Sequence, residues 1–326
     1  MACNEGCGYG VDLEQARAIV YRDPVTHHLH ELRGVSGQIK WTHTDLTQVT
    51  GAPPADCFAN GYAWKAGNSV QVVFSTWDDG HVHALYRYKG GTWAHADLTA
   101  KTGAPPMPDA VGLVNAYAWE GITSKQIVYW DAQSKHVIEL FAVAGDPHGW
   151  QWADLTAIAG APPVSNSSFM VNGYAWEGLH AKQVVFWDLA GQIHELYTTG
   201  GAWTFADLTD IIAKSGGPPL APIQAVIAGF AFEAGHSKHV VFQHESSRVY
   251  ELLVPEGGTW WFQEATTELP QSPGGISPID VKGVYAWESG QSRQIVFQST
   301  DGHIQELIHP VAGSWTPADR SAAAGL

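Results

Sequence analysis

An internal repeat of about 55 residues constrains the fold of this chain more than any other feature. The segment GYAWEGLHAKQVVFWD, which starts at Gly173, has counterparts that start at Gly61, Ala116, Gly229 and Val284, and a more divergent copy starts at Gly8. In each copy a tryptophan stands four residues before an acidic residue, and successive tryptophans are 52, 57, 53, 57 and 55 residues apart. We therefore expect six copies of one structural unit along the 326 residues.

Each repeat contains four short runs that are typical of β-strands. In the fourth copy these are GYAWE, QVVFW, IHELY and AWTFADL, separated by turn residues, and none of them has helical periodicity. Four strands in each unit predict an all-β fold, a six-bladed β-propeller of four-stranded antiparallel blades. We expect one domain over residues 1–326, with approximate repeats 1–54, 55–108, 109–165, 166–222, 223–278 and 279–326. In the ADLT and GAPP segments, the aspartate is predicted to cap a turn and the prolines to stiffen the connection between blades.

Charge excludes some classes of partner. The chain has 17 Lys and Arg against 32 Asp and Glu, a formal charge of -15, whereas nucleic acid binding needs a dense basic surface. No apolar stretch approaches a membrane span, so we expect no membrane insertion. The opening MACNEGCGYG lacks the features of a signal peptide. We therefore expect synthesis in the cytoplasm, and release by an unconventional route stays open. The sequence also leaves open whether the protein forms a homo-oligomer.

Polar residues that repeat with the blades favour binding over catalysis. An enzyme site is normally unique, because an acid, a base and a nucleophile need different surroundings. Repeated weak sites instead gain avidity in a multivalent binder. Gln and Glu can hold neighbouring hydroxyl groups, and Trp offers a flat face to a sugar ring, so we expect a lectin without cofactors whose partners are glycans or glycoconjugates. The candidates are Gln126, Gln183, His239 and Gln294; Glu139, Glu195, Glu251 and Glu306; and Trp93, Trp150, Trp203, Trp260 and Trp315.

The first two repeats are predicted to hold the poorest sites. Glu31, Trp41 and Gln71 belong to the same series there, but Ala18 and Ala84 replace polar groups of the other repeats. A structural role stays open for all the series, in which Gln and Glu bond the backbone between blades and Trp fills the interfaces between blades.

The stretch QVVFWDLAGQIHEL followed by GAW resembles the blade motif of the fucose-binding propeller lectins, which include six-bladed fungal Aleuria-type lectins and related bacterial proteins. The resemblance covers almost the whole chain. It implies a sugar pocket between adjacent blades, lined by an arginine that opens the second strand, a glutamate in the third strand and tryptophans. In that motif the second-strand and third-strand residues are 12 positions apart. The same spacing separates Gln183 from Glu195, His239 from Glu251 and Gln294 from Glu306, whereas Gln126 and Glu139 are 13 positions apart.

The chain departs from this motif at the arginine, where Gln or His stands instead. A cation comes one residue earlier in five repeats, at Arg17, Lys125, Lys182, Lys238 and Arg293. Successive side chains on a strand point to opposite faces, so we expect these cations not to replace the arginine directly. The predicted ligand is a small monosaccharide unit, fucose or a related, modified sugar.

The sequence also bears on three alternatives to a lectin: an enzyme, a protein-interaction scaffold and a metal-binding protein. The acids Asp12, Glu120, Glu177, Glu233 and Glu288 could line a central channel and support an enzyme at its mouth. An interaction scaffold is a further alternative, although the sequence lacks the Gly-His and Trp-Asp signature of that propeller family. The pairs His28 with His30 and His81 with His83 could share a strand face, but the other repeats do not keep the pair, and the three cysteines lack zinc spacing. We therefore expect no metal site.

Overall fold

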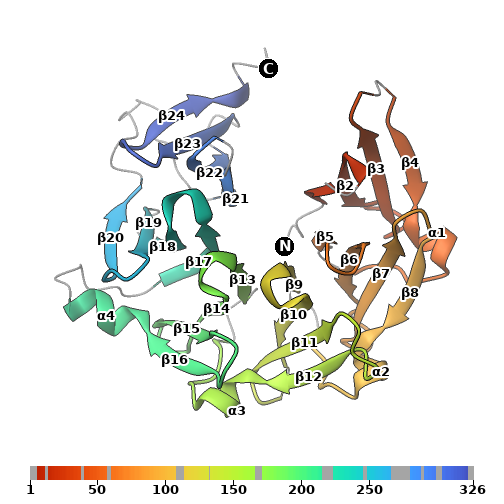
Figure 1. Ribbon diagram of the computed structural model, residues 1–326, viewed down its shortest axis with the longest axis horizontal. Helices are drawn as coiled ribbons and strands as arrows, with labels where there is room; N and C mark the ends of the chain where they lie inside the picture. Colours follow the sequence, from red (N-terminus) through yellow and green to blue (C-terminus); the bar gives the residue numbers. More distant parts are fainter. Residues whose placement is uncertain are drawn as a thin grey trace. The chain divides into compact units, whose positions relative to one another are not determined.

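The computed structural model describes residues 6–11, 14–37, 40–56, 60–107, 114–131, 133–165, 171–214, 223–244, 248–265, 280–287, 290–298 and 303–321. The fold is a six-bladed β-propeller, and each blade is a four-stranded antiparallel sheet whose strands follow one another in chain order (Figure 1). This confirms the fold class predicted from the repeat. The chain forms two compact units, residues 1–173 and 174–326, which we describe separately.

The first unit holds blades 1 to 3. Their strands are β1 (Gly6–Val11), β2 (Ala16–Arg22), β3 (Leu29–Val35) and β4 (Thr42–Asp45); β5 (Asn60–Trp64), β6 (Ser69–Ser75), β7 (Val82–Tyr88) and β8 (Ala94–Asp97); and β9 (Asn115–Trp119), β10 (Ser124–Trp130), β11 (Val137–Val143) and β12 (Gln151–Asp154). Helices α1 (Leu46–Thr50), α2 (Leu98–Thr102) and α3 (Leu155–Ala159) follow the fourth strands, and the short 3-10 turn η2 (Glu120–Ile122) precedes β10.

The second unit holds blades 4 to 6, of which blade 4 begins at the boundary between the units. Their strands are β13 (Asn172–Trp176), β14 (Ala181–Trp187), β15 (Ile193–Thr198) and β16 (Thr204–Asp207); β17 (Ile223–Phe232), β18 (Ser237–His244), β19 (Val249–Pro255) and β20 (Trp261–Glu264); and β21 (Asp280–Trp287), β22 (Ser292–Gln298), β23 (Ile304–Pro310) and β24 (Thr316–Asp319). Helix α4 (Leu208–Lys214) follows β16, and the 3-10 turns η3 (Glu177–Leu179) and η4 (Glu233–Gly235) precede β14 and β18.

In blades 2, 3 and 4 the second strand is the most buried element. Every residue of β6, β10 and β14 is buried. These strands are near-continuous runs of β-branched and aromatic residues, as expected for a strand that is covered on both faces. The few polar side chains on these strands therefore lie between blades, which is where the resemblance implies the sugar sites.

Short helices after the fourth strands correct the expectation that the repeats hold no helix. Asp154 is the N-cap of α3 and accepts a hydrogen bond from the Ala157 backbone N–H, as Asp45 and Asp97 do in α1 and α2. The capping role predicted for the aspartate is confirmed, although it caps a helix instead of a simple turn. The next threonine ties the helix to the sheet, since Thr156 Oγ1 accepts a 2.8 Å bond from the Val137 N–H.

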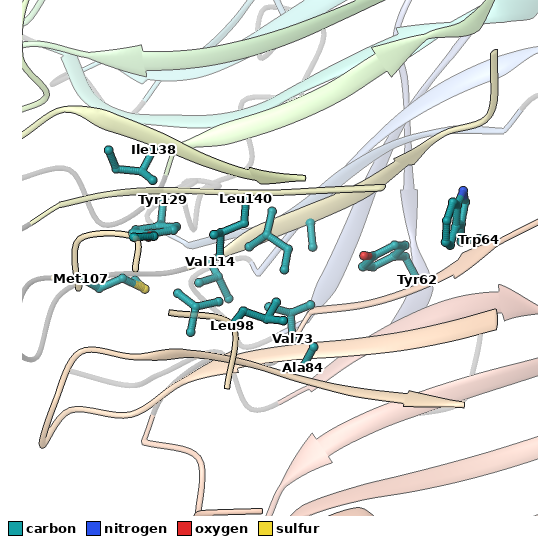
Figure 2. Packing of buried hydrophobic residues seen from close by; sticks show 14 residues of the cluster. Tyr62, Trp64, Val73, Ala84, Leu98, Met107, Val114, Tyr129, Ile138 and Leu140 are labelled. Atoms are coloured by element: carbon teal, nitrogen blue, oxygen red, sulfur yellow. The ribbon is translucent and has the colours of Figure 1, made fainter. Parts of the chain in front are cut away.

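Apolar side chains from blades 2 and 3 form one continuous core. Figure 2 shows this cluster as a row that runs from Met107 and Ile138 at one end to Tyr62 and Trp64 at the other. Tyr129, near the first end, is fully buried and donates a 2.8 Å hydrogen bond to the Pro105 carbonyl. The two blades are therefore packed against each other along this row.

Candidate functional site between the blades

The predicted Gln and Glu series share one face of each blade. In blade 3, Val128 pairs with Glu139 across β10 and β11, and Gln126 lies two residues from Val128 on the same face. Blade 5 has the same register, and there the two side chains meet, since His239 Nδ1 donates a 2.8 Å hydrogen bond to Glu251 Oε1. The Gln or His and the Glu of these blades therefore lie on the same face.

The glutamine amides are turned toward their own strand. Gln71, Gln126 and Gln294 each donate through Nε2 to the serine hydroxyl two residues earlier, at 2.9, 2.5 and 2.7 Å. Each of the four glutamine side chains, including Gln183, is buried and has an Oε1 atom without a hydrogen-bond partner among the described residues. A buried acceptor of this kind is usually paired with water or a ligand.

Between blades 4 and 5, a cation from one blade reaches the acid of the other. Lys238 Nζ lies 2.8 and 2.6 Å from the two carboxylate oxygens of Glu195, and the Tyr174 hydroxyl donates to the same carboxylate at 3.2 Å. Lys238 Nζ also lies 5.0 Å from the centre of the Trp260 ring and 5.5 Å from that of Tyr197. Acid, cation and aromatic ring therefore form one constellation across the interface between two blades.

The interface between blades 5 and 6 repeats this constellation with an arginine. Arg293 donates to Glu251 through Nε at 2.7 Å and Nη2 at 3.1 Å, and its guanidinium lies 5.2 Å from the Trp315 ring. Burial alone would raise the pKa of Glu251, but the hydrogen bonds and charges of His239 and Arg293 outweigh it and lower the pKa to about 2. Burial lowers the pKa of His239, so its imidazole is neutral and accepts from the Ser237 hydroxyl at 2.7 Å.

These contacts correct the expectation about the cations. Strand alternation does place Lys238 on the face opposite His239, as predicted. That opposite face packs against the acid-bearing face of the preceding blade, so Lys238 bonds Glu195 and Arg293 bonds Glu251. The cation therefore lies beside the glutamate after all, but it comes from the neighbouring blade.

Every tryptophan of the predicted series lies beside a cation. In blade 2, where Val70 stands in place of the strand-2 cation, Arg87 replaces it from the directly opposite position on β7. Arg87 also bonds Glu14 at 3.0 Å. The pairs, with distances to the ring centre, are Arg17 with Trp41 at 5.0 Å, Arg87 with Trp93 at 5.5 Å, Lys125 with Trp150 at 4.7 Å and Lys182 with Trp203 at 4.9 Å, besides the two pairs given above. Each ring therefore stabilises its cation through a cation–π contact.

The remaining acids of the series are also buried. Glu31 and Glu139 are 3% and 1% exposed. Glu306 accepts a 2.7 Å bond from the Tyr285 hydroxyl and a 2.6 Å bond from Arg320 Nε. A sugar-binding role for the Gln, Glu and Trp series stays a prediction.

An open cavity lies between blades 2 and 3. It has a volume of about 430 Å³, and of the predicted site residues only Trp150 lines it. The sequence reasoning missed the other aromatic walls, Trp64, Tyr86 and Tyr88. Gly67 supports the Trp64 ring from close by, since a Cβ at Gly67 would lie 2.1 Å from that ring. This cavity adjoins the second repeat, and the expectation that this repeat makes a poor site stays a prediction.

Lys125 lies in this cavity between two indole rings. Its Nζ is 4.9 Å from the centre of the Trp64 ring, which belongs to blade 2, and 4.7 Å from that of Trp150, which belongs to blade 3. Burial and the neighbouring positive charge of Lys101 lower the pKa of Lys125 to about 8. The ammonium group therefore still carries its charge at neutral pH.

The acids suggested as channel-lining groups bond the backbone of a neighbouring blade. The carboxylate of Glu120 accepts from the N–H groups of Lys65 and Ala66 at 2.6 and 2.9 Å, and that of Glu233 accepts from Glu177 and Gly178 at 2.7 and 3.2 Å. Their repetition thus has a structural cause. Asp12 and Glu288 lie outside the described residues.

The histidine pairs suggested for a metal have other partners. His28 and His81 each donate through Nδ1 to the capping aspartate, Asp45 at 2.8 Å and Asp97 at 2.7 Å. In the part of the chain that the structure describes, no three His, Cys, Asp or Glu side chains are placed to hold a metal ion. Cys3 and Cys57 lie outside the described residues.

Comparison with solved structures finds propeller lectins. AofleA from Arthrobotrys oligospora has a TM-score of 0.61 at 12% identity, covering 97% of this chain and 86% of its own. The BP39L lectin from Burkholderia pseudomallei has a TM-score of 0.61 at 14% identity, and the match covers 97% of this chain and 84% of that lectin. A fucose-specific lectin from Aleuria aurantia has a TM-score of 0.59 at 12% identity, and the match covers 96% of this chain and 93% of that lectin. The fold is that of these lectins. The resemblance expected from the blade motif is thus confirmed at the level of the fold.

The same fold also occurs outside the lectins. A putative 6-phosphogluconolactonase from Bacteroides uniformis has a TM-score of 0.57 at 12% identity, covering 95% of this chain and 83% of its own. No protein-family model and no curated protein sequence matches the chain. Among the described residues, no helix has the length and apolar character needed to cross a membrane. Any assignment of function therefore depends on the site itself.

Proposed function

We propose that this protein is a carbohydrate-binding lectin that recognises small monosaccharide units between adjacent blades, and that it is not an enzyme. The observation that carries the proposal is the 430 Å³ cavity between blades 2 and 3, whose walls include Trp64, Trp150, Tyr86 and Tyr88. Its volume is typical of small-molecule sites. Aromatic rings offer flat apolar faces to the C–H side of a sugar ring, and Lys125 offers a donor to its hydroxyl groups.

The repeated constellations support the same class of ligand at other interfaces. Glu195 with Lys238, and Glu251 with Arg293, are charged donor–acceptor pairs next to an indole ring. Sugar hydroxyls both donate and accept hydrogen bonds, so they can bridge such a pair. Several weak sites of this kind would give avidity for a glycan surface, and fucose or a related, modified sugar is the proposed unit.

Two observations favour binding over catalysis, even though one structural neighbour is a putative lactonase. The polar groups recur from blade to blade, whereas a reaction site needs distinct groups in one place. The repeated acids Glu120 and Glu233 are bonded to backbone N–H groups of a neighbouring blade. They are therefore used to join blades in the described part of the chain.

A glycan array with the purified protein tests the proposal. We expect binding to a defined set of glycans, and we expect Trp150→Ala to weaken that binding by about tenfold or more, because the ring is a wall of the cavity. Trp152→Ala is the matched control, since Trp152 is 40% exposed and does not line the cavity. Absence of binding to any glycan would contradict the lectin function, and equal loss in both variants would contradict the position of the site.

A further inference from the structure

The interface between blades 2 and 3 differs from the two constellations of the second unit by one missing carboxylate. Ala84 pairs with Val73 on β6, as Glu195 pairs with Val185 on β14 and Glu251 with Val241 on β18. Glu195 and Glu251 each bond the cation of the following blade. Alanine at position 84 removes that partner, and the open cavity lies at this interface.

Lys125 is the cation that this substitution leaves without an acid. It is 7% exposed and forms no ion pair with any described residue, whereas its counterparts Lys238 and Arg293 each pair with a glutamate. Burying a charge costs free energy unless an opposite charge or hydrogen-bonding groups compensate it. The two indole rings compensate Lys125 only in part, through their π faces.

The other groups of the cavity leave room for one negative charge. Lys101 on α2 adds a second cation to the lining, and Tyr86 and Tyr88 on β7 add two phenols. The Asp146 carboxylate also lines it, but its oxygens already accept from the His148 N–H and the Gln151 side chain, both at 2.9 Å. The lining thus holds two cations against one carboxylate that is bonded to its own loop.

We propose that this cavity binds a hexuronate, a sugar whose own carboxylate pairs with Lys125 in place of the missing glutamate. The proposal rests on the proposed lectin function and narrows its ligand at this one interface. The sugar ring lies against Trp64 or Trp150, and the carboxylate completes the acid, cation and indole constellation that blades 4, 5 and 6 build from protein side chains alone. A hexuronate suits the site better than a phosphorylated sugar, because the group absent from position 84 is a single carboxylate with one negative charge.

Titration calorimetry with D-galacturonate and D-glucuronate, each compared with the neutral D-galactose and D-glucose, tests this proposal. We expect at least one uronate to bind about tenfold or more tightly than its neutral counterpart, with one site per chain. Galactose 6-phosphate is included in the series, and tighter binding of the phosphate than of both uronates would overturn the assignment to a carboxylate.

Two variants locate the effect at Lys125. Lys125→Met keeps an unbranched apolar side chain without the ammonium group and should abolish the preference for the uronate. Ala84→Glu supplies the missing acid, so it should also abolish the preference by pairing with Lys125 as Glu195 pairs with Lys238. Lys89→Met is the control and should keep the preference, because Lys89 is exposed and does not line the cavity. A preference that survives Lys125→Met would overturn the proposal.

The pH dependence gives a readout that needs no variant. Because deprotonated Lys125 cannot pair with a carboxylate, the affinity for the uronate should fall as the pH rises above about 8, while a neutral sugar should show no such fall. The other titratable groups that line the cavity are Lys101, Asp146, Tyr86 and Tyr88. Equal affinities of uronate and neutral sugar at pH 7, with Trp150-dependent binding of both, would refute the hexuronate while leaving the lectin function intact.

Discussion

Thr123 adopts a backbone conformation that suits its side chain poorly. It ends the turn η2 in the left-handed region, with φ 53° and ψ 43°, and its side chain is exposed. The residue just before the second strand has a positive φ in every blade, and none of the six is glycine: they are Gln15, Asn68, Thr123, His180, His236 and Gln291. A β-branched residue is the most strained of these. The turn therefore stores strain in each blade.

Replacing Thr123 with asparagine should stabilise the protein. Asparagine tolerates the left-handed region, and the exposed threonine side chain loses no buried contact. We expect Thr123→Asn to raise the free energy of unfolding by about 0.5–1 kcal/mol, measured by urea denaturation. Asn68→Thr, the reverse change at the equivalent turn of blade 2, should lower it by a similar amount. A loss of stability in Thr123→Asn would contradict this account of the turn.

The buried Glu251 should make stability depend on acid pH. Its pKa in the folded state is about 2, against 4.5 for an unperturbed glutamate, because His239 and Arg293 outweigh the effect of burial. A lowered pKa contributes stability that is complete above 4.5 and is lost as the pH falls toward 2. At pH 7, Glu251→Gln leaves Arg293 without its acid and should cost about 3–5 kcal/mol.

Urea denaturation at pH 7, 5, 4 and 3 checks this prediction. The loss of stability between pH 5 and pH 3 should be smaller in Glu251→Gln than in the natural protein. Glu256→Gln is the control, because Glu256 is about half exposed and lies on the same blade. If both variants keep the full acid-dependent loss, another carboxylate is responsible for it.

The aspartate that ends the fourth strand joins three parts of a blade. Asp154 ends β12, caps α3 through Oδ1 and accepts a 2.7 Å bond from His136 Nδ1 through Oδ2. His136 directly precedes β11, so the aspartate links two strands and a helix. The histidine–aspartate bond recurs between His28 and Asp45, His81 and Asp97, and His303 and Asp319, and Asp45 and Asp97 also cap a helix.

Removing this aspartate should therefore loosen the outer edge of blade 3. We expect Asp154→Ala to lower the free energy of unfolding by about 1–2 kcal/mol, through loss of the cap and of the histidine bond. Asp154→Asn keeps an oxygen for the cap and should lose less. Equal losses in the two variants would show that the charge of the aspartate, and not the cap, is what stabilises the blade.

The sequence predicts the strands of these blades better than their helices. Runs such as QVVFW are long enough to show β periodicity and are bounded by turn residues. The helix Leu155–Ala159 has only five residues, so LTAIA is too short for helical periodicity to appear. The capping aspartate was the one signal, and it fits a turn as well as a helix.

At the scale of the whole molecule, the repeat alone was sufficient to predict six blades of four strands. The site could be predicted only in part, because it lies between blades. The repeat predicts Trp150, whereas strand alternation turns Lys125 away from Gln126 and so gives no reason to expect it in the site. Which face meets the next blade depends on how two sheets pack, and this is not contained in the pattern of either sheet. The same limit hid Trp64, which reaches the cavity from the preceding blade.

The alanine at position 84 also has an evolutionary consequence. When the copies of a duplicated blade carry the same acid and the same cation, the acid of one copy can pair with the cation of the next, as Glu195 pairs with Lys238. A copy that loses the acid frees the cation of the next copy for a molecule from outside, and the remaining copies preserve the fold while that happens. In such an array, a new ligand specificity can arise through the loss of one acidic side chain, without the gain of any new binding group.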